Sequence, residues 1–155
     1  MNKKKLIILC IVLLMLIGSV LGYILYKRNV IPVDPNAKDY TENIKAPEGF
    51  SNDQILIPGF KNINIPNTYS GKGMELLNPK ENNVYFRYEV VLQETNNTVA
   101  KTEFIPPGKA VEIFPWKGIS PGNYNLLVKI KTYSIEDTKK ELNGANLKIK
   151  MNILK

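Results

Sequence analysis

Apolar and polar positions divide the chain into three parts with different patterns. Residues 6–26 form an unbroken apolar run without a charged side chain, bracketed by Lys3–Lys5 and by Lys27-Arg28. At about 1.5 Å of rise per residue, twenty-odd helical residues span the roughly 30 Å hydrocarbon core of a bilayer. Residues 27–53 show no sustained period, and from residue 54 onward apolar and polar residues alternate in short runs. The pattern predicts a transmembrane helix, a linker and a β-rich domain.

The β-rich part, residues 54–155, contains eight candidate strands: residues 54–57, 61–65, 74–78, 83–94, 98–105, 110–114, 123–134 and 147–154. The runs 83–94, 123–134 and 147–154 alternate cleanly, which is typical of half-buried antiparallel strands. Seven or eight strands in about 100 residues, without a helical period, favour an all-β, immunoglobulin-like antiparallel β-sandwich. Asn96-Asn97 suits a tight hairpin, and Pro107-Gly108 and Pro121-Gly122 suit type II turns.

The apolar run has three possible interpretations: a retained signal-anchor, a cleaved signal peptide and a lipoprotein signal at Cys10. As a retained signal-anchor it leaves residues 1–5 in the cytoplasm and places the C-terminal domain outside, because three lysines precede the span and only Lys27-Arg28 follow it. As a signal peptide it would be cleaved near Gly22 and the protein would be secreted. Cleaved signals usually have cores of about 7–15 residues, and this cleavage would leave the apolar stub 23–26, so retention is favoured. Lipidation at Cys10 is not expected, since Cys10 lies near the start of the run.

Residues 27–53 contain Pro32, Pro35 and Pro47 and are predicted to be a flexible linker. A flexible chain of about 25 residues reaches roughly 25–30 Å. The folded domain, predicted over residues 54–155, would therefore stay close to the membrane.

Charge and composition narrow the possible functions. The net charge is +7, but five of the 21 basic residues flank the apolar run and all 14 acidic residues follow residue 28. The outer part therefore carries only +2, which is no nucleic-acid footprint. The chain has no histidine and its single cysteine is Cys10, so zinc sites and Cys- or His-based catalysis are not expected outside the membrane. Glu75, Glu103 and Glu112 have no context that pairs them for hydrolysis. We expect no enzyme activity, catalytic residue, metal or cofactor, and a tethered hydrolase is a remote alternative.

Several short motifs are similar to those of small membrane-anchored surface proteins of Gram-positive bacteria of the Firmicutes kind. The motifs are Leu56–Phe60, Asn78-Pro79, Asn83–Phe86, Pro107–Lys109, Gly122–Tyr124 and Asn143–Ala145. The resemblance implies an exported, membrane-anchored β-domain on the wall side. Such proteins generally have no assigned activity, and the resemblance supplies no catalytic residues.

The outward face of the two longest strands is the candidate partner-binding surface. Its residues are Tyr85, Arg87 and Glu89 on one strand and Leu127, Lys129, Lys131 and Tyr133 on the other. If the strands are neighbours, these side chains form an aromatic and basic patch, and Tyr and Arg are enriched at binding hot spots. The alternative is a solvated face whose cross-strand pairs, such as Glu89 with a lysine, support the fold.

Trp116 lies in a predicted loop and has two possible roles. It could stack on a sugar of the cell wall, or it could close one end of the sandwich. The leading functional prediction is a non-enzymatic surface protein that contacts other proteins, as an accessory of a secretion, conjugation or adhesion assembly. The alternative is a wall-carbohydrate-binding module. A buried Lys–Asn crosslink is not expected, because the lysines occupy mainly outward positions.

Overall fold

The computed structural model describes residues 2–40, 44–51, 53–66 and 71–155. Met1 of the predicted tail and residues 41–43 and 52 of the predicted linker lie outside the described residues. The chain divides into two compact units, Met1–Ile31 and Pro32–Lys155.

The first unit is one helix, α1 (Lys3–Asn29). The side chain of Asn2 caps its start by accepting a hydrogen bond from the Lys4 backbone N–H, a common role of asparagine. The stretch Lys3–Tyr26 contains an 18-residue window with a mean hydropathy of 2.9, and none of that window is buried. The predicted apolar helix is thus present, and its length and composition fit a membrane anchor or a signal sequence.

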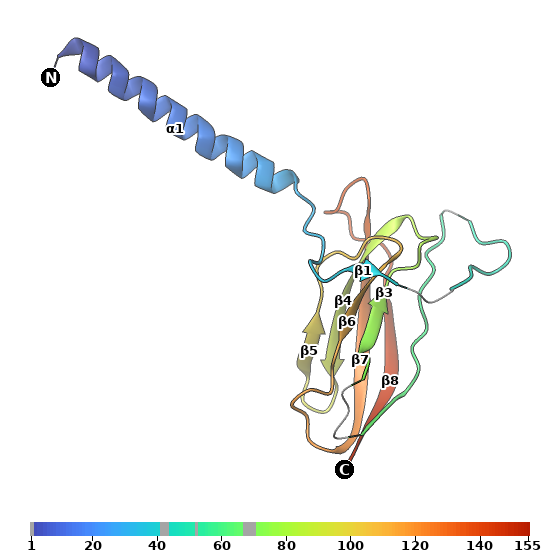
Figure 1. The fold of residues 1–155 in the computed structure, drawn as a ribbon. Helices are drawn as coiled ribbons and strands as arrows, with labels where there is room; N and C mark the ends of the chain where they lie inside the picture. Colours follow the sequence, from blue (N-terminus) through green and yellow to red (C-terminus); the bar gives the residue numbers. More distant parts are fainter. Residues whose placement is uncertain (1, 41–43, 52, 67–70) are drawn as a thin grey trace. The chain divides into compact units, whose positions relative to one another are not determined.

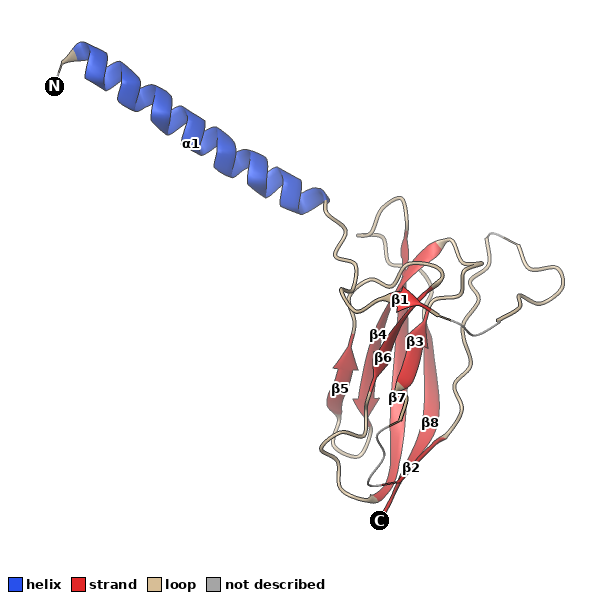
Figure 2. Ribbon diagram, in the orientation of Figure 1, coloured by secondary structure: helices blue, strands red, loops and turns tan. Residues whose placement is uncertain are grey.

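The second unit is built from two sheets (Figures 1 and 2). The smaller is antiparallel, in the order β1 (Lys38–Asp39), β6 (Lys109–Ile113) and β3 (Met74–Leu77). The larger has the order β2 (Ile63–Pro66), β8 (Ala145–Leu154), β7 (Gly122–Ser134), β4 (Val84–Leu92) and β5 (Asn97–Lys101). In it β2 runs parallel to β8 and every other pair is antiparallel. This arrangement is consistent with the predicted β-sandwich.

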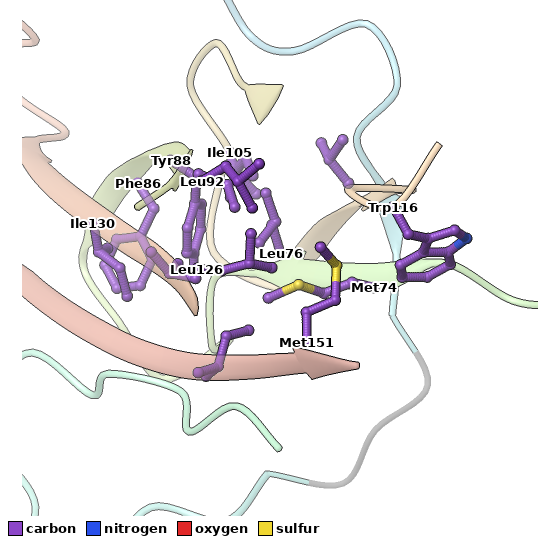
Figure 3. Close-up of a cluster of buried hydrophobic side chains, with 14 of the residues drawn as sticks. Met74, Leu76, Phe86, Tyr88, Leu92, Ile105, Trp116, Leu126, Ile130 and Met151 are labelled. Atoms are coloured by element: carbon purple, nitrogen blue, oxygen red, sulfur yellow. The ribbon is translucent and has the colours of Figure 1, made fainter. Parts of the chain in front are cut away.

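The alternation along β4 places its apolar residues in the core. Phe86, Tyr88 and Val90 are at most 1% exposed, whereas Tyr85 and Arg87 between them are only half-buried. Residues of both sheets meet in one buried cluster, with Leu76 and Val111 contributed by the smaller sheet. Figure 3 shows Trp116 beside Met74 at one end of this cluster and Phe86 and Ile130 at the other. Complete burial of each such side chain contributes about 1.5–3 kcal/mol.

One predicted strand is absent. Residues 54–57 form no strand. The backbone of Leu56 is hydrogen-bonded to the side chain of Asn82 instead of to a neighbouring strand. The Leu56 backbone N–H donates to Asn82 Oδ1 (2.7 Å), and Asn82 Nδ2 donates to the Leu56 carbonyl (3.0 Å). Asn82 is itself buried, so it holds the segment at one point without a ladder.

The expected linker also differs from the structure, since the second unit begins at Pro32 rather than near residue 54. Residues 32–40, here called the strap, join the folded unit in two places. Val33 forms a parallel bridge with Phe104, and β1 pairs with β6. Asp34 explains the first attachment: it is buried, and its Oδ2 accepts a hydrogen bond from the Glu103 backbone N–H (3.0 Å).

Two of the three predicted turns have the expected backbone. Asn96 (φ 55°) and Gly108 (φ 78°) are in the left-handed region. The prediction of a type II turn at Pro121-Gly122 was wrong, because Gly122 is the first residue of β7. In the connection between β6 and β7 the residue with a left-handed backbone is Gly118 (φ 76°).

Candidate functional site

The β4–β7 register brings the predicted partner-binding residues together. Tyr85 lies opposite Tyr133, Arg87 opposite Lys131, and Glu89 opposite Lys129. These six residues share the outward side of the larger sheet and are called the β4–β7 face below. Leu127 lies on the same side, opposite Val91. Because β4 and β7 pair over nine positions, the backbone under the face is rigid.

An aromatic cluster forms at one end of the β4–β7 face. The Phe104 ring lies 5.6 Å from that of Tyr85 and 5.0 Å from that of Tyr133, between centroids. The guanidinium of Arg87 lies 4.9 Å from the Phe104 ring centroid, a cation–π geometry. Phe104 is only 4% exposed, whereas both tyrosines are half-buried. The exposed edges at this end therefore belong to the tyrosines.

The charges of the β4–β7 face are balanced. Arg87 and Lys131 stand directly opposite one another, an unfavourable pairing of like charges. Each is compensated by an acid from outside the face: Arg87 pairs with Glu103, and Lys131 Nζ lies 3.3 Å from Glu141 Oε2.

The third cation of the face, Lys129, lies 3.5 Å from Glu89 Oε2. Every cation of the face thus has an acidic neighbour. The predicted aromatic and basic patch is aromatic, but it is not basic.

Two pKa values on the face are shifted. The pKa of Glu89 is lowered, mainly because Thr98 Oγ1 donates a hydrogen bond to Glu89 Oε1 (3.0 Å), with a further contribution from the charge of Lys129. The pKa of Tyr133 is raised, first by partial burial and then by Glu141. The Tyr133 hydroxyl donates a 3.2 Å hydrogen bond to Glu141 Oε2, and the negative charge of Glu141 disfavours its ionisation. At neutral pH Glu89 is therefore ionised and Tyr133 keeps its proton.

A shallow depression of about 250 Å³ lies beside the face. It is lined by residues of β4, β5 and β7 and by Thr102. The strand residues are Arg87, Tyr88, Glu89, Lys101, Lys131 and Tyr133. It offers aromatic edges and paired charges on a fixed backbone. This chemistry suits recognition of another surface.

The sequence prediction did not include Phe104, Glu103 and Glu141. Phe104 and Glu103 reach the face because Ile105 pairs with Phe86 of β4. Glu141 reaches it through a bridge with Tyr133. Neither bridge could be predicted from the sequence pattern, because each pairs a residue of β4 or β7 with a residue outside the strands.

Trp116 occupies the position expected if it closes the sandwich. It is 9% exposed, belongs to the buried cluster and packs edge-on against Phe114, with ring centroids 5.7 Å apart. The loop around it is closed by hydrogen bonds from Lys117 N–H to the Phe114 carbonyl and from Ile119 N–H to the Trp116 carbonyl. A ring so deeply packed has little free face on which a sugar could stack.

No protein-family model, curated protein or solved structure matches this chain. The resemblance to Gram-positive surface proteins stays a prediction.

Proposed function

We propose that this chain is a non-enzymatic, single-pass membrane-anchored surface protein whose β-domain makes protein–protein contacts near the membrane. The three lysines before the span favour an N-terminus inside and residues 32–155 outside. A role as an accessory of a secretion, conjugation or adhesion assembly fits this location. Retention of the anchor is favoured over cleavage near Gly22, because cleavage would leave Tyr23–Tyr26 as an exposed apolar end.

Two features support an immunoglobulin-like description of the domain. In that scheme the larger sheet corresponds to strands A′, G, F, C and C′, and the β3–β6 pair corresponds to strands B and E. The second feature is Tyr124, near the start of β7, whose hydroxyl donates to the Ser120 carbonyl (2.9 Å). A tyrosine that bonds back across the E–F corner in this way is a hallmark of such sandwiches.

The observation that carries the functional proposal is the assembly of the six side chains of the β4–β7 face on two paired central strands. Arg87 is a residue type that dominates binding energy at protein interfaces, and it stands beside the charged Glu89–Lys129 pair on the same two strands. Their cross-strand neighbours hold them in place, so a partner would meet a preorganised surface.

Site-specific photo-crosslinking in cells that carry the full chain tests this proposal. The crosslinking amino acid replaces Lys129 of the β4–β7 face, and in a matched control it replaces Asn64, which is exposed on β2. We expect protein adducts heavier than the monomer from position 129 and none from position 64.

Absence of adducts at position 129, or the same adducts at both positions, would contradict the proposal. Adducts that resist protease but disappear on digestion of the wall glycan would instead favour the carbohydrate-binding alternative.

A further inference from the structure

The chain enters the folded unit at a defined place. The Pro32 carbonyl accepts a hydrogen bond from the Phe104 N–H (3.1 Å), and the Asp34 N–H donates to the Phe104 carbonyl (2.9 Å). The start of the strap is thereby fixed beside the aromatic end of the β4–β7 face. In Figure 1 the strap and the C-terminus lie at opposite ends of this unit.

Few residues separate this place from the end of the apolar span. The span ends at Tyr26 and the helix ends at Asn29, so residues 27–29 and three more steps of chain lead to Pro32. Helical residues rise about 1.5 Å each and extended ones about 3.3–3.6 Å, which limits the connection to roughly 15 Å. The polar headgroup layer on each side of a bilayer is itself about 5–8 Å thick. Pro32 therefore cannot lie far above the headgroups of a membrane that holds the span.

Phe104 carries this constraint to the β4–β7 face. The rings of Tyr85 and Tyr133 contact Phe104, whose backbone N–H is hydrogen-bonded to the Pro32 carbonyl. Val33, which pairs with Phe104, is 43% exposed. Tyrosine prefers the membrane–water interface, where its ring is covered by acyl chains and its hydroxyl is hydrated. The nearby charges are already paired, Arg87 with Glu103 and Lys131 with Glu141.

We infer that the aromatic end of the β4–β7 face, formed by Tyr85, Tyr133 and Val33, rests in the lipid headgroup layer of the outer leaflet. The membrane is then the ligand of this end. The Glu89–Lys129 pair lies four residues farther along each strand, about 13 Å away, and this pair and Arg87 stay free for a protein partner. The inference rests on the proposed function, because it requires the anchor to be retained.

Trp116 supplies an internal reference for the test. It is the chain's single tryptophan, and it lies at the end of the buried cluster opposite Phe86 and Ile130 (Figure 3). Its fluorescence should report on the end of the domain that faces away from the membrane.

The full chain is reconstituted into phosphatidylcholine vesicles that contain a phosphatidylcholine brominated near its headgroup, which quenches tryptophan on contact. Tyr133→Trp adds a tryptophan at the aromatic end, and Asn64→Trp adds one on β2 as a matched control. We expect about a twofold loss of the emission added by Tyr133→Trp and no loss for Asn64→Trp or wild-type Trp116. The vesicles hold no other protein, so quenching cannot come from a partner.

Extraction of the vesicles with alkaline carbonate separates the two proposals. Equal emission from Tyr133→Trp with and without brominated lipid, in a chain that resists extraction, would overturn this inference and leave the anchored function standing. A chain that is extracted would overturn both. Quenching that appears only after addition of phosphatidylglycerol would also overturn it, because the contact would then belong to the cations.

Discussion

The β4–β7 face and the loop that carries Trp116 both present aromatic side chains, but their surroundings differ. On the face, Tyr85 and Tyr133 stand on paired strands, keep exposed edges and are flanked by balanced charges. In the loop, Trp116 turns inward beside Phe114 and becomes part of the buried cluster. The backbone of a strand fixes the direction of its tyrosines, whereas the loop lets Trp116 turn toward the apolar core. Trp116 therefore contributes to the stability of the fold, whereas the edges of the two tyrosines stay accessible for the contacts that we propose.

The largest effect should come from the loop. Trp116→Ala removes a buried ring and leaves a cavity, so it should lower the free energy of unfolding by about 3 kcal/mol. Tyr133→Ala on the face should cost clearly less, because its ring is partly exposed. Urea unfolding of the full chain in detergent, followed by circular dichroism, measures both. An equal or smaller loss for Trp116→Ala would show that Trp116 contributes no more to stability than Tyr133 does.

The strap should come next. Asp34→Ala removes a buried carboxylate that accepts hydrogen bonds from the backbone N–H groups of Asn36 and Glu103, and it should cost about 2 kcal/mol. Hydrogen exchange of the Phe104 N–H, which donates to Pro32, should become faster.

Asp39→Ala is the matched control for the strap. The Asp39 side chain is 86% exposed and, among the described residues, forms an ion pair with Lys109 alone, so the stability should hardly change. Equal exchange at Phe104 in Asp34→Ala and in the wild type would show that the strap does not depend on Asp34.

On the face itself, Arg87→Ala should have a smaller effect, about 1 kcal/mol. It removes a partly exposed ion pair with Glu103 and the stacking on Phe104. Arg87→Lys should recover only part of the loss, because an ammonium keeps the charge without the planar stack. Complete recovery, measured by thermal unfolding, would mean that only charge matters at this position.

The smallest effect should be the pH dependence of Glu89. Its pKa lies below the ordinary value of 4.5, so its ionised form stabilises the fold above that pH and this contribution is lost as the pH falls through the lowered pKa. Glu89→Gln should therefore lower the melting temperature near pH 7, by the equivalent of about 0.5 kcal/mol, and the difference from the wild type should shrink as the pH falls through the lowered pKa of Glu89. A difference that persists at low pH would assign the effect to packing rather than to charge.

Strand alternation explains how much of the fold could be predicted. Successive side chains of a strand point to opposite sides, so the inward Phe86 and Tyr88 and the outward Tyr85 and Arg87 follow from the pattern alone. The neighbouring positions of β4 and β7 were expected from the usual order of such sandwiches. For these reasons the six residues of the face could be named before their pairing was known.

The rest depends on contacts between distant residues. Lys38–Asp39 forms a strand of only two residues, too short for a periodic signal, and it exists because β6 offers an edge. The charge balance of the face could not be predicted either, since Glu103 and Glu141 arrive from other turns of the chain. At residues 54–57 the Asn82 side chain makes two hydrogen bonds to the Leu56 backbone, and no strand forms. Strand propensity does not predict such a long-range side-chain contact.

The strap has a mechanical consequence. A force transmitted through the N-terminal segment would act first on residues 32–40, where it must break the bonds at Phe104 and Glu103, the β1–β6 pairing and the hydrogen bond from the Lys80 N–H to the Tyr40 hydroxyl. Their release would free residues 32–40, which span at most roughly 30 Å when extended, while the buried cluster stayed intact. Residues 32–40 can thus detach and extend under force before the buried cluster of the sandwich is disrupted.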